Sequence, residues 1–482
     1  MQRKFLTNLA LLLFLNLLVK PFWVLGIDRS VQNIVGEEAF GFYFTLFNFS
    51  FLFNMLLDLG ITNFNNRNIA QNHQLLNKHF SGILILKLLL AGLYAIITFA
   101  IAFFIDYSPE QIYLLVWVAL NQFLLSFIMY LRSNISGLLM FKTDSFISVL
   151  DRLLMILFCS VLLWGRGTGA SPFEIKWFVY AQTLAYSLTA VLAFVVVVKK
   201  SKFRKPNWNW PFFVMIIKQS FPFAILVFLM TMYYRSDTIF LERLLPGTLG
   251  DQQSGVYAKA FRLLDAANMI PMLFAVLLLP LYSRMIKLKE SVTPLVKLSF
   301  SLLFTLAVIV TVSSYFYSYE LMDLLYYENI AEASAVFKRI MFSFIGISTI
   351  YIFGSLLTAN GNLKELNIIS FIALLVNFGL NFILIPKMYA LGSAYANLAT
   401  QFTAAIPQLI LAIVIFKFKL DYKYIIALLV FVIGVVLLNM LSKEVPFAWH
   451  INFMLMICAS VVLAGLLRLL NIQSLLKVLK DR

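Results

Sequence analysis

Runs of about twenty apolar residues recur along the whole chain, with short polar stretches between them. A run of this length can cross the ~30 Å hydrocarbon core of a membrane as a helix. Helices are favoured over strands because an open sheet edge would leave backbone groups unsatisfied in lipid. The pattern therefore predicts an all-α membrane protein with about fourteen transmembrane helices, at residues 7–27, 39–62, 81–105, 111–131, 144–164, 175–198, 219–241, 256–281, 296–318, 336–358, 367–385, 391–416, 424–441 and 449–470.

The composition agrees with this class of protein. Of the 482 residues, 62% are hydrophobic and 12% are charged, whereas soluble domains have about 25% charged residues. The first apolar run contains Lys20 and Pro21 and lacks a small-residue cleavage site, so we expect a retained span and not a signal peptide. Cys159, Cys458 and the three histidines form no cluster with metal-ligand spacing. We therefore predict no disulfide, metal site or cofactor.

The segment from Asn16 to Tyr43 recurs in part 214 residues later in the chain. Charges and glycines align at this single offset without a gap, which indicates an internal duplication; the alternative is coincidence in a biased composition. The matching positions are Asp28-Arg29 with Glu242-Arg243, Gly36-Glu37 with Gly250-Asp251, Gly41 with Gly255, Tyr43 with Tyr257, Phe47 with Phe261, and Asn54 with Asn268.

The duplication predicts the domain organisation. We expect an amino-terminal six-helix lobe at 1–198, a basic cytoplasmic linker at 199–218, and a carboxy-terminal six-helix lobe at 219–416. Residues 417–482 would then add two further helices and a cytoplasmic tail.

Lysine and arginine are concentrated in alternate connecting segments, which predicts the orientation. The segment 199–218 is the richest, whereas the loops on the other side hold only Arg29, Arg166, Arg243, Lys387 and Lys443. Because basic loops stay in the cytoplasm, both termini are expected there. The net charge of +16 then reflects an inner face that contacts anionic membrane lipids, and nucleic acid is not an expected partner.

Several cations are expected inside the outer half of the membrane. Lys20, Arg235, Lys259 and Arg262 lie within predicted spans, and the duplication places Lys20 one position from the equivalent of Arg235. Buried cations are costly and usually functional, so we interpret them as the lining of a water-filled cationic cavity for an anionic ligand. The alternative is structural salt bridges and snorkelling side chains, which we favour for Lys87, Asp58 and Arg468 near the inner ends of spans.

Other charged residues are candidates for coupling or gating. Lys259, Arg262 and Asp265 recur every three residues and share a helix face. Arg29 and Arg243 occupy equivalent positions outside the first helix of each lobe, and we expect each to approach an acid of the opposite lobe in a closed outer gate. The full set of coupling or gating candidates is Asp28, Asp58, Asp237, Glu242, Arg243 and Asp265.

Two motifs do not indicate an enzyme. The glycine-rich segment 165–171 lacks the Lys-Ser/Thr ending of a phosphate-binding loop, so we expect a turn. Asp28, Glu37 and Glu38 could be metal ligands of a membrane glycosyltransferase, but the duplication copies two of them, which suits a symmetric loop better than a single active site.

A further motif lies in the predicted eleventh and twelfth spans, as Val376-Asn377-Phe378-Gly379-Leu380-Asn381-Phe382-Ile383-Leu384-Ile385-Pro386 followed by Leu391-Gly392-Ser393-Ala394. It resembles the multidrug/oligosaccharidyl-lipid/polysaccharide (MOP) exporter superfamily, which carries a similar Asn-x3-Asn-x3-Ile-Pro and Gly-x-Ala. Within that superfamily the chain is similar to the O-antigen and polysaccharide flippases. One departure is Tyr389, where the family usually has glycine.

The resemblance implies a flippase without enzymatic activity. Such a protein would move a polyisoprenyl-diphosphate-linked oligosaccharide, such as an O-antigen, capsule or exopolysaccharide repeat unit, to the outer leaflet by alternating access. Its expected partners are this anionic lipid-linked substrate, membrane lipids, a polysaccharide polymerase and glycosyltransferases. The substrate-binding candidates are Lys20, Arg29, Arg235, Lys259 and Arg262. The alternatives are a cation-coupled drug antiporter of the same superfamily, whose cavity should favour acids, and a membrane-embedded polymerase or glycosyltransferase, for which no large outer loop is present.

Overall fold

A computed structural model gives the fold of the chain. It describes residues 14–16, 18–19, 21–62, 65, 69, 74–138, 140–165, 173–201, 208–418 and 421–470. The described residues are almost all helical and contain no strand, which confirms the all-α fold class. They form two compact units, Met1–Gly255 and Val256–Arg482.

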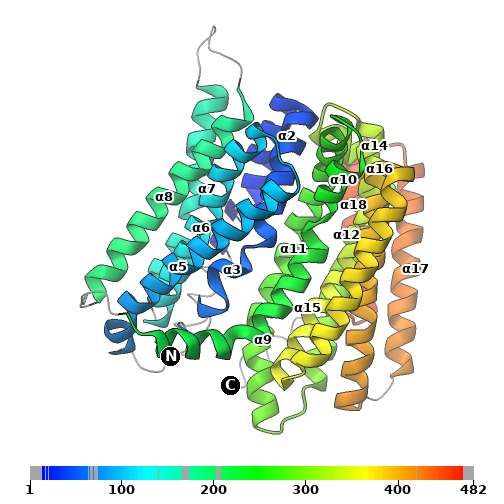
Figure 1. Ribbon diagram of the computed structural model, residues 1–482. Helices are drawn as coiled ribbons and strands as arrows, with labels where there is room; N and C mark the ends of the chain where they lie inside the picture. The colour runs from blue at the N-terminus through cyan, green and yellow to red at the C-terminus, as the bar shows by residue number, and fades with distance from the viewer. Residues whose placement is uncertain are drawn as a thin grey trace. The chain divides into compact units, whose positions relative to one another are not determined.

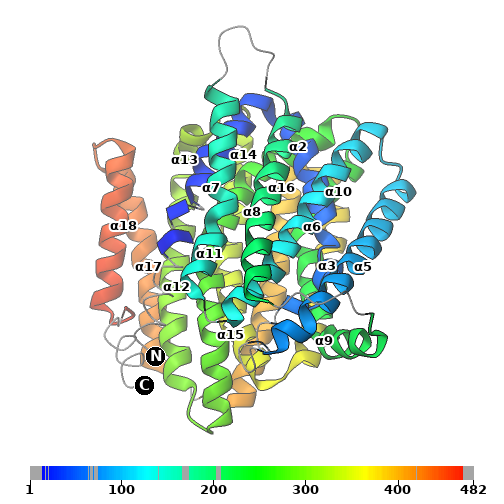
Figure 2. The same cartoon turned by 90° about the vertical axis from the view of Figure 1, so that its left-hand side faces the viewer.

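The first unit contains the helices that run from the amino terminus to the start of α11. Helices α5, α6, α7 and α8 lie side by side, and α2 packs on α6, α8, α9 and α10 (Figures 1 and 2). The elements are η1 (Trp23–Asp28), α2 (Arg29–Leu52), α3 (Met55–Asp58), α5 (Gln74–Phe104), α6 (Pro109–Gly137), α7 (Phe141–Trp164), α8 (Ile175–Lys200), α9 (Trp210–Arg235), α10 (Asp237–Leu244) and the first turns of α11 (Leu249–Lys287).

The first two predicted spans are joined differently from the expected polar loop. The chain stays helical through Asp28 and Arg29, first as the π-helical segment η1 and then as α2. It changes direction at Gly36, whose φ of 83° and ψ of 171° interrupt α2. A single glycine suffices because it alone adopts this conformation without steric cost.

The second unit holds the rest of α11 and the helices that follow it. Helix α15 packs along α16, α14 also packs on α16, and α17 and α18 lie side by side (Figure 1). The elements are α12 (Thr293–Phe316), α13 (Ser318–Leu325), α14 (Ile330–Ile340), α15 (Ser343–Asn360), α16 (Leu363–Phe416), α17 (Tyr422–Glu444) and α18 (Trp449–Leu466).

Helix α16 contains both the eleventh and the twelfth predicted spans. The two parts meet at Tyr389, which has a φ of 52° and a ψ of −134°. A Cβ atom on nearby Gly392 would lie 2.5 Å from the carbonyl oxygen of Leu384, so this glycine allows the two parts to approach closely. The turn therefore depends on Gly392, while Tyr389 takes a strained backbone conformation that favours glycine.

The two additional helices of the carboxy-terminal region pack on the lobe through an apolar core. Phe431 and Val435 of α17 are fully buried against Val308 and Val312 of α12, together with Ala464 of α18. The interface buries one stripe of α17 and leaves its other faces exposed, as expected for a membrane-spanning helix at the edge of a helical bundle.

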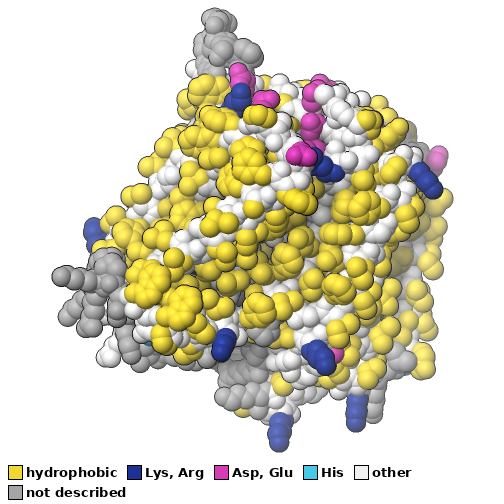
Figure 3. All heavy atoms as spheres, viewed as in Figure 1, with side chains coloured by type: hydrophobic (Ala, Val, Ile, Leu, Met, Phe, Trp, Pro, Cys, Tyr) yellow, Lys and Arg dark blue, Asp and Glu magenta, His cyan; other side chains and the backbone are white. Residues whose placement is uncertain are grey.

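The surface is that of a multi-pass membrane protein. Nine of the described helices are long and apolar enough to cross a membrane, and the pair Phe223–Arg235 and Asp237–Leu244, bent by 46°, would add a tenth. On the face in Figure 3, hydrophobic side chains cover the middle of the helices, and most charged side chains lie near their ends. The exact count of fourteen spans and the lobe boundaries at 199–218 remain predictions.

Candidate functional site

A close contact between α2 and the start of α11 is the first candidate site. A Cβ atom on Gly41 would lie 1.9 Å from the carbonyl oxygen of Asp251 and 2.7 Å from the nitrogen of Gly255. A Cβ atom on Gly255 would lie 2.3 Å from the carbonyl oxygen of Glu37. These distances exclude any side chain, so glycine at both positions lets the two backbones touch.

The contact follows the sequence repeat. Gly41 and Gly255 are equivalent positions, as are Glu37 and Asp251. Gly41 packs on the backbone of Asp251, and Gly255 packs on the backbone of Glu37, so the two contacts are equivalent under the repeat. Such a reciprocal contact is expected where two copies of one structure meet across a two-fold axis.

Polar side chains hold the same helices together beside the glycines. Gln32 Nε2 donates to the carbonyl oxygen of Gly255 at 3.0 Å, and Asn48 Nδ2 donates to Thr238 Oγ1 at 3.0 Å. Ser254 Oγ donates to the carbonyl oxygen of Thr238 at 3.2 Å. Helices α2, α10 and α11 are therefore linked by buried hydrogen bonds in addition to the glycine contact.

An acidic cluster surrounds this junction. Glu242 accepts a hydrogen bond from Gln111 Nε2 at 2.7 Å and lies 3.5 Å from Arg243 Nε. The Arg243 guanidinium also lies over the Tyr107 ring, 4.6 Å from its centroid. Burial, and then the charges of Glu242 and Glu38, raise the pKa of Asp251 to about 7. Burial also raises the pKa of Tyr107 well above its usual value. The cluster thus contains a carboxyl group that titrates near neutral pH.

These residues include two of the predicted gating candidates, Glu242 and Arg243. The described contacts of Arg243 are with its neighbour Glu242 and with Tyr107. Asp28 is buried and Arg29 is half-buried at the join of η1 and α2. The expected pairing of each arginine with an acid of the opposite lobe remains a prediction.

The cavity candidates lie on several helices. Arg235 ends α9 in the first unit, and its guanidinium lies over the rings of Phe51 and Tyr234, 5.2 and 5.1 Å from their centroids. In the second unit Lys259 is buried, donates to the carbonyl oxygen of Glu328 at 2.6 Å, and lies 5.3 Å from the Tyr326 ring centroid. Aromatic rings can compensate part of the cost of burying a cation.

The remaining site predictions have these positions in the structure. Arg262 and Asp265 are half-buried on α11 one turn apart, as their spacing predicts. Asp237 is buried at the start of α10, just after the bend. Lys20 lies outside the described residues.

Arg152 is a half-buried cation to which the sequence assigned no role. Its Nη1 donates to the Tyr186 hydroxyl at 3.2 Å, and its guanidinium lies over the Trp23 and Tyr186 rings, 5.6 and 5.8 Å from their centroids. Asp151 provides an ion pair at 3.7 Å. Trp23 belongs to η1, so the π-helical segment is fixed to α7 and α8 by this cation. In the sequence, only the adjacency of Asp151 and Arg152 indicated this ion pair.

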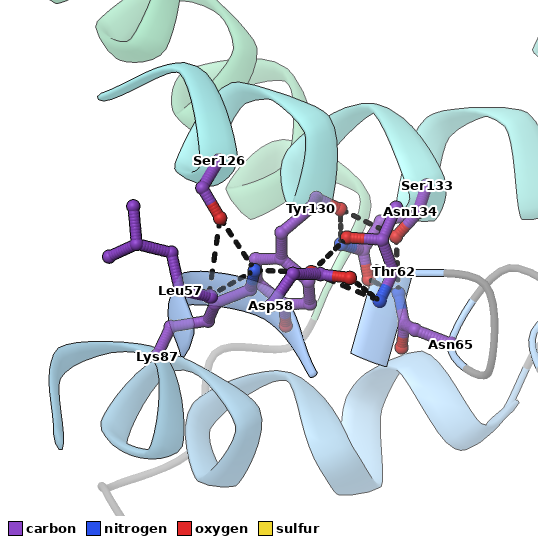
Figure 4. A network of polar contacts seen from close by, with 9 residues as sticks. All are labelled: Leu57, Asp58, Thr62, Asn65, Lys87, Ser126, Tyr130, Ser133 and Asn134. Carbon is purple, nitrogen blue, oxygen red and sulfur yellow. Dashed lines mark hydrogen bonds and ion pairs between the residues drawn. The ribbon is translucent and has the colours of Figure 1, made fainter. Parts of the chain in front are cut away.

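A second polar network joins α3, α5 and α6 (Figure 4). The Lys87 ammonium donates to the carbonyl oxygen of Leu57 at 2.9 Å, to Asp58 Oδ1 at 2.5 Å and to Ser126 Oγ at 3.0 Å. All three donors of the ammonium group are thus satisfied. Leu57 lies in the last turn of the short helix α3, which ends at Asp58 because Leu59 and Gly60 both have positive φ. Lys87 therefore caps the carboxy-terminal end of this short helix.

The network continues along the same face of α6. Asp58 accepts hydrogen bonds from the Thr62 backbone nitrogen at 3.3 Å and from Thr62 Oγ1 at 2.5 Å. Asn65 Nδ2 donates to Ser133 Oγ at 2.8 Å and to Asn134 Oδ1 at 3.1 Å. Asp58 is thus held on two sides, by the cation and by the residues that resume the helix.

Comparison with known proteins agrees with this architecture. The chain resembles a solved structure of the lipid II flippase MurJ in an inward closed conformation, at 12% identity and a TM-score of 0.67, covering 95% of this chain and 97% of the other. It also resembles a MOP superfamily transporter from Pyrococcus furiosus, at 14% identity and a TM-score of 0.61, covering 86% and 96%. An outward-facing multidrug resistance MATE family transporter aligns at 14% identity and a TM-score of 0.62, over 86% and 96%. These likenesses establish the MOP transporter fold.

No curated protein matches the chain by sequence. The family model for polysaccharide biosynthesis proteins matches residues 7–286, which is more than half of the sequence. The predicted resemblance is thus confirmed, and the chain belongs to the polysaccharide biosynthesis protein family.

Proposed function

We propose that the protein is a flippase for polyisoprenyl-diphosphate-linked oligosaccharide in a bacterial inner membrane. The family match and the MOP fold support a transporter in polysaccharide biosynthesis. The observation that carries the choice of substrate is the placement of cations within apolar helices. Arg235, Lys259 and Arg262 occupy such positions, and the first two lie against aromatic rings.

A diphosphate suits these residues because guanidinium and ammonium groups bind phosphate oxygens with charge-assisted hydrogen bonds. The rings that flank Arg235 and Lys259 also provide apolar faces on which sugars can pack. The lipid tail would stay in the bilayer while the cations hold the headgroup. Transport would follow from alternating access between the lobes at 1–198 and 219–416, with both termini in the cytoplasm.

A cation-coupled drug antiporter is the second candidate, because MATE multidrug transporters share the fold. A cavity for cationic drugs should be lined by acids without compensating bases. The cations of α9 and α11 favour the anionic substrate over this alternative.

Reconstitution into proteoliposomes distinguishes the two functions. A fluorescent polyprenyl-diphosphate oligosaccharide should become accessible to a membrane-impermeant quencher only in vesicles that contain the protein. A cationic dye should not be transported by the same vesicles under a proton or sodium gradient. Dye transport without movement of the lipid-linked sugar would overturn the proposal in favour of the antiporter.

A further inference from the structure

Arg339, in the last turn of α14, is a cation inside a candidate membrane span. Helices α14 and α15 together form the candidate span Ile330–Asn360. Arg339 lies ~14 Å along the helix from the start of this span, and its side chain is half-buried. A cation at such a depth is costly unless it is compensated or has a function, so its contacts indicate its role.

Arg339 contacts a hydroxyl group and not an acid. Its Nε donates to the hydroxyl oxygen of Tyr395 on α16 at 3.2 Å. Among the described residues, Arg339 forms no ion pair, and neither its Nη groups nor the hydroxyl hydrogen of Tyr395 has a hydrogen-bond partner. A guanidinium group carries five N–H donors in a planar fork. The single contact through Nε therefore orients this fork and leaves its Nη groups available to a ligand.

The end of α14 does not require the Arg339 side chain. A cation in the last turn of a helix can compensate the terminal carbonyl groups. Here the carbonyl oxygens of Phe337, Arg339 and Met341 already accept hydrogen bonds from backbone nitrogens. Thr311 Oγ1 of α12 also donates to the carbonyl oxygen of Met341, at 2.9 Å. Capping of the helix thus does not explain why the guanidinium contacts α16.

The neighbouring cation, Lys338, has a different environment. Its ammonium lies 5.6 Å from the centroid of the Tyr315 ring on α12. Adjacent residues of a helix point about 100° apart, which agrees with Lys338 contacting α12 while Arg339 contacts α16. Lys338 shares the charge and the helix end with Arg339 but lacks the hydroxyl contact, so it provides a matched control.

We propose that Arg339 and Tyr395 form a phosphate-binding site within the second unit, in addition to the cations already proposed to bind the substrate. The identity of the ligand rests on the proposed transport function: it would be the diphosphate of the lipid-linked oligosaccharide. The headgroup phosphate of a bilayer lipid presents the same chemistry. The two Nη groups can donate in parallel to two oxygens of one phosphate group. Because the Tyr395 oxygen already accepts from Nε, its hydrogen is left to donate to the same ligand.

Chemical modification of the parent protein tests the site without a substitution. Phenylglyoxal condenses with the Nη groups of arginine, which are the groups that would hold the phosphate. The full chain in maltoside detergent would be treated with and without farnesyl diphosphate, a soluble polyisoprenyl diphosphate, and the modified peptides measured by mass spectrometry. At about ten times its Kd, farnesyl diphosphate should slow the modification of Arg339 about tenfold, because only the free fraction reacts.

Arg132 is an internal control in the same experiment. Its Nε and Nη2 donate to Asp144 at 2.8 and 3.3 Å, so its guanidinium already has a carboxylate partner. The ligand should leave the modification of Arg132 unchanged.

Substitutions test the geometry of the site. Arg339→Lys keeps the charge but loses the planar fork, and it should weaken binding of farnesyl diphosphate about tenfold or more. Tyr395→Phe keeps the ring but loses the hydroxyl group, and it should weaken binding about fivefold. Lys338→Ala should bind like the parent. Thermophoresis in detergent measures these affinities, and thermal unfolding checks that each variant is folded.

A second ligand identifies the source of the phosphate. Dioctanoyl phosphatidylglycerol, which carries one phosphate group in a lipid headgroup, would be titrated under the same conditions. Tighter binding of farnesyl diphosphate that is weakened by Arg339→Lys would support a site for the transported diphosphate. Equal or tighter binding of the phosphatidylglycerol, weakened by the same substitution, would support a site for bilayer lipid.

Equal modification of Arg339 with and without both ligands would overturn the site, and so would parent-like binding by a folded Arg339→Lys variant. Protection in the parent protein decides the question if a variant does not fold. Failure of the proposed function would give a different result. Farnesyl diphosphate would still protect Arg339, but proteoliposomes containing the protein would move no lipid-linked sugar.

Discussion

Lys87 and Asp58 form an ion pair at 2.5 Å, in which the lysine side chain is 2% exposed and the aspartate 28% exposed. The lysine also caps the end of α3 through the carbonyl oxygen of Leu57. The two residues are 29 positions apart in the sequence, so the pair fixes a break in one span to the middle of another helix. This geometry agrees with a structural role for both residues.

Breaking this pair from one side should destabilise the protein. Asp58→Asn leaves a buried ammonium without its counter-charge, and the loss of one partner of a buried pair costs about 3–5 kcal/mol. Asp58→Asn combined with Lys87→Met removes both charges and should cost less than Asp58→Asn alone. Thermal unfolding in detergent, compared across the double-mutant cycle, measures the difference.

The exposed pair of Lys297 and Asp421, at 2.6 Å, is the matched control. Surface ion pairs contribute only about 0.2–1 kcal/mol, so Lys297→Ala should unfold at nearly the parent temperature. An equal decrease in unfolding temperature for Asp58→Asn and Lys297→Ala would contradict the structural importance of the buried pair.

Transport should depend on the membrane-embedded cations. Arg235→Ala and Arg262→Ala should each lower delivery of lipid-linked glycan by tenfold or more, because a charge-assisted contact to phosphate is worth about 1.5–3 kcal/mol. The measurement is surface glycan per unit of protein in the membrane. Lys20→Ala tests the cation that the repeat places one position from the equivalent of Arg235. Normal transport by these variants would refute the hypothesis that these cations bind the substrate. Loss of the protein itself would indicate structural salt bridges.

Orientation can be tested by cysteine accessibility. Single cysteines at 208–218 and at 288–292 should be protected from an impermeant reagent added outside, because these segments lie on the basic side of the chain. Cysteines in α13 (Ser318–Leu325), on the opposite side, should be labelled. The reverse pattern would invert the orientation and place the glycine contact on the cytoplasmic side.

Replacing the strained residue of α16 should stabilise the protein. Tyr389 has a φ of 52° and its side chain is 43% exposed, so Tyr389→Gly removes strain with little loss of packing. The expected gain is about 1 kcal/mol, at the low end of what such a conformation costs. Tyr422→Gly, at an exposed residue that begins α17 with ordinary geometry, should not stabilise the protein. A lower unfolding temperature for Tyr389→Gly would show that the ring makes a contact that outweighs the strain.

The sequence predicted helices well because length and apolarity alone determine a membrane span. It placed α7, α8, α12 and α17 within a few residues of their bounds in the structure. It did not predict that Asp28 and Arg29 would stay helical, since a charged pair normally marks the end of a span. The sequence also did not predict the 46° bend between Arg235 and Asp237, because no proline or glycine lies at that point.

The candidate site was predictable in part. The repeat identified Gly41 and Gly255 as equivalent, but the contact between their backbones could not be predicted, because contact between distant helices depends on packing. A structural role was favoured for Lys87 and for Asp58 because each lies near the inner end of its span, and Asp58 was also a gating candidate. Their pairing and the capping of α3 could not be predicted, because both depend on the backbone break at Leu59. Aromatic neighbours such as Tyr107 under Arg243 come from other helices and cannot be read from a local pattern.

The reciprocity of the glycine contact bears on the history of the chain. If the two halves descend from one gene, Gly41 and Gly255 were once the same residue in two separate copies, and that residue met its partner across a homodimer axis. A single mutation in that ancestor would have changed both sides of the junction at once. After fusion each side could vary alone, and the acids that flank it are now Glu37 on one helix and Asp251 on the other. Gene fusion would thus have allowed the two sides of a contact that began as a symmetric one to diverge.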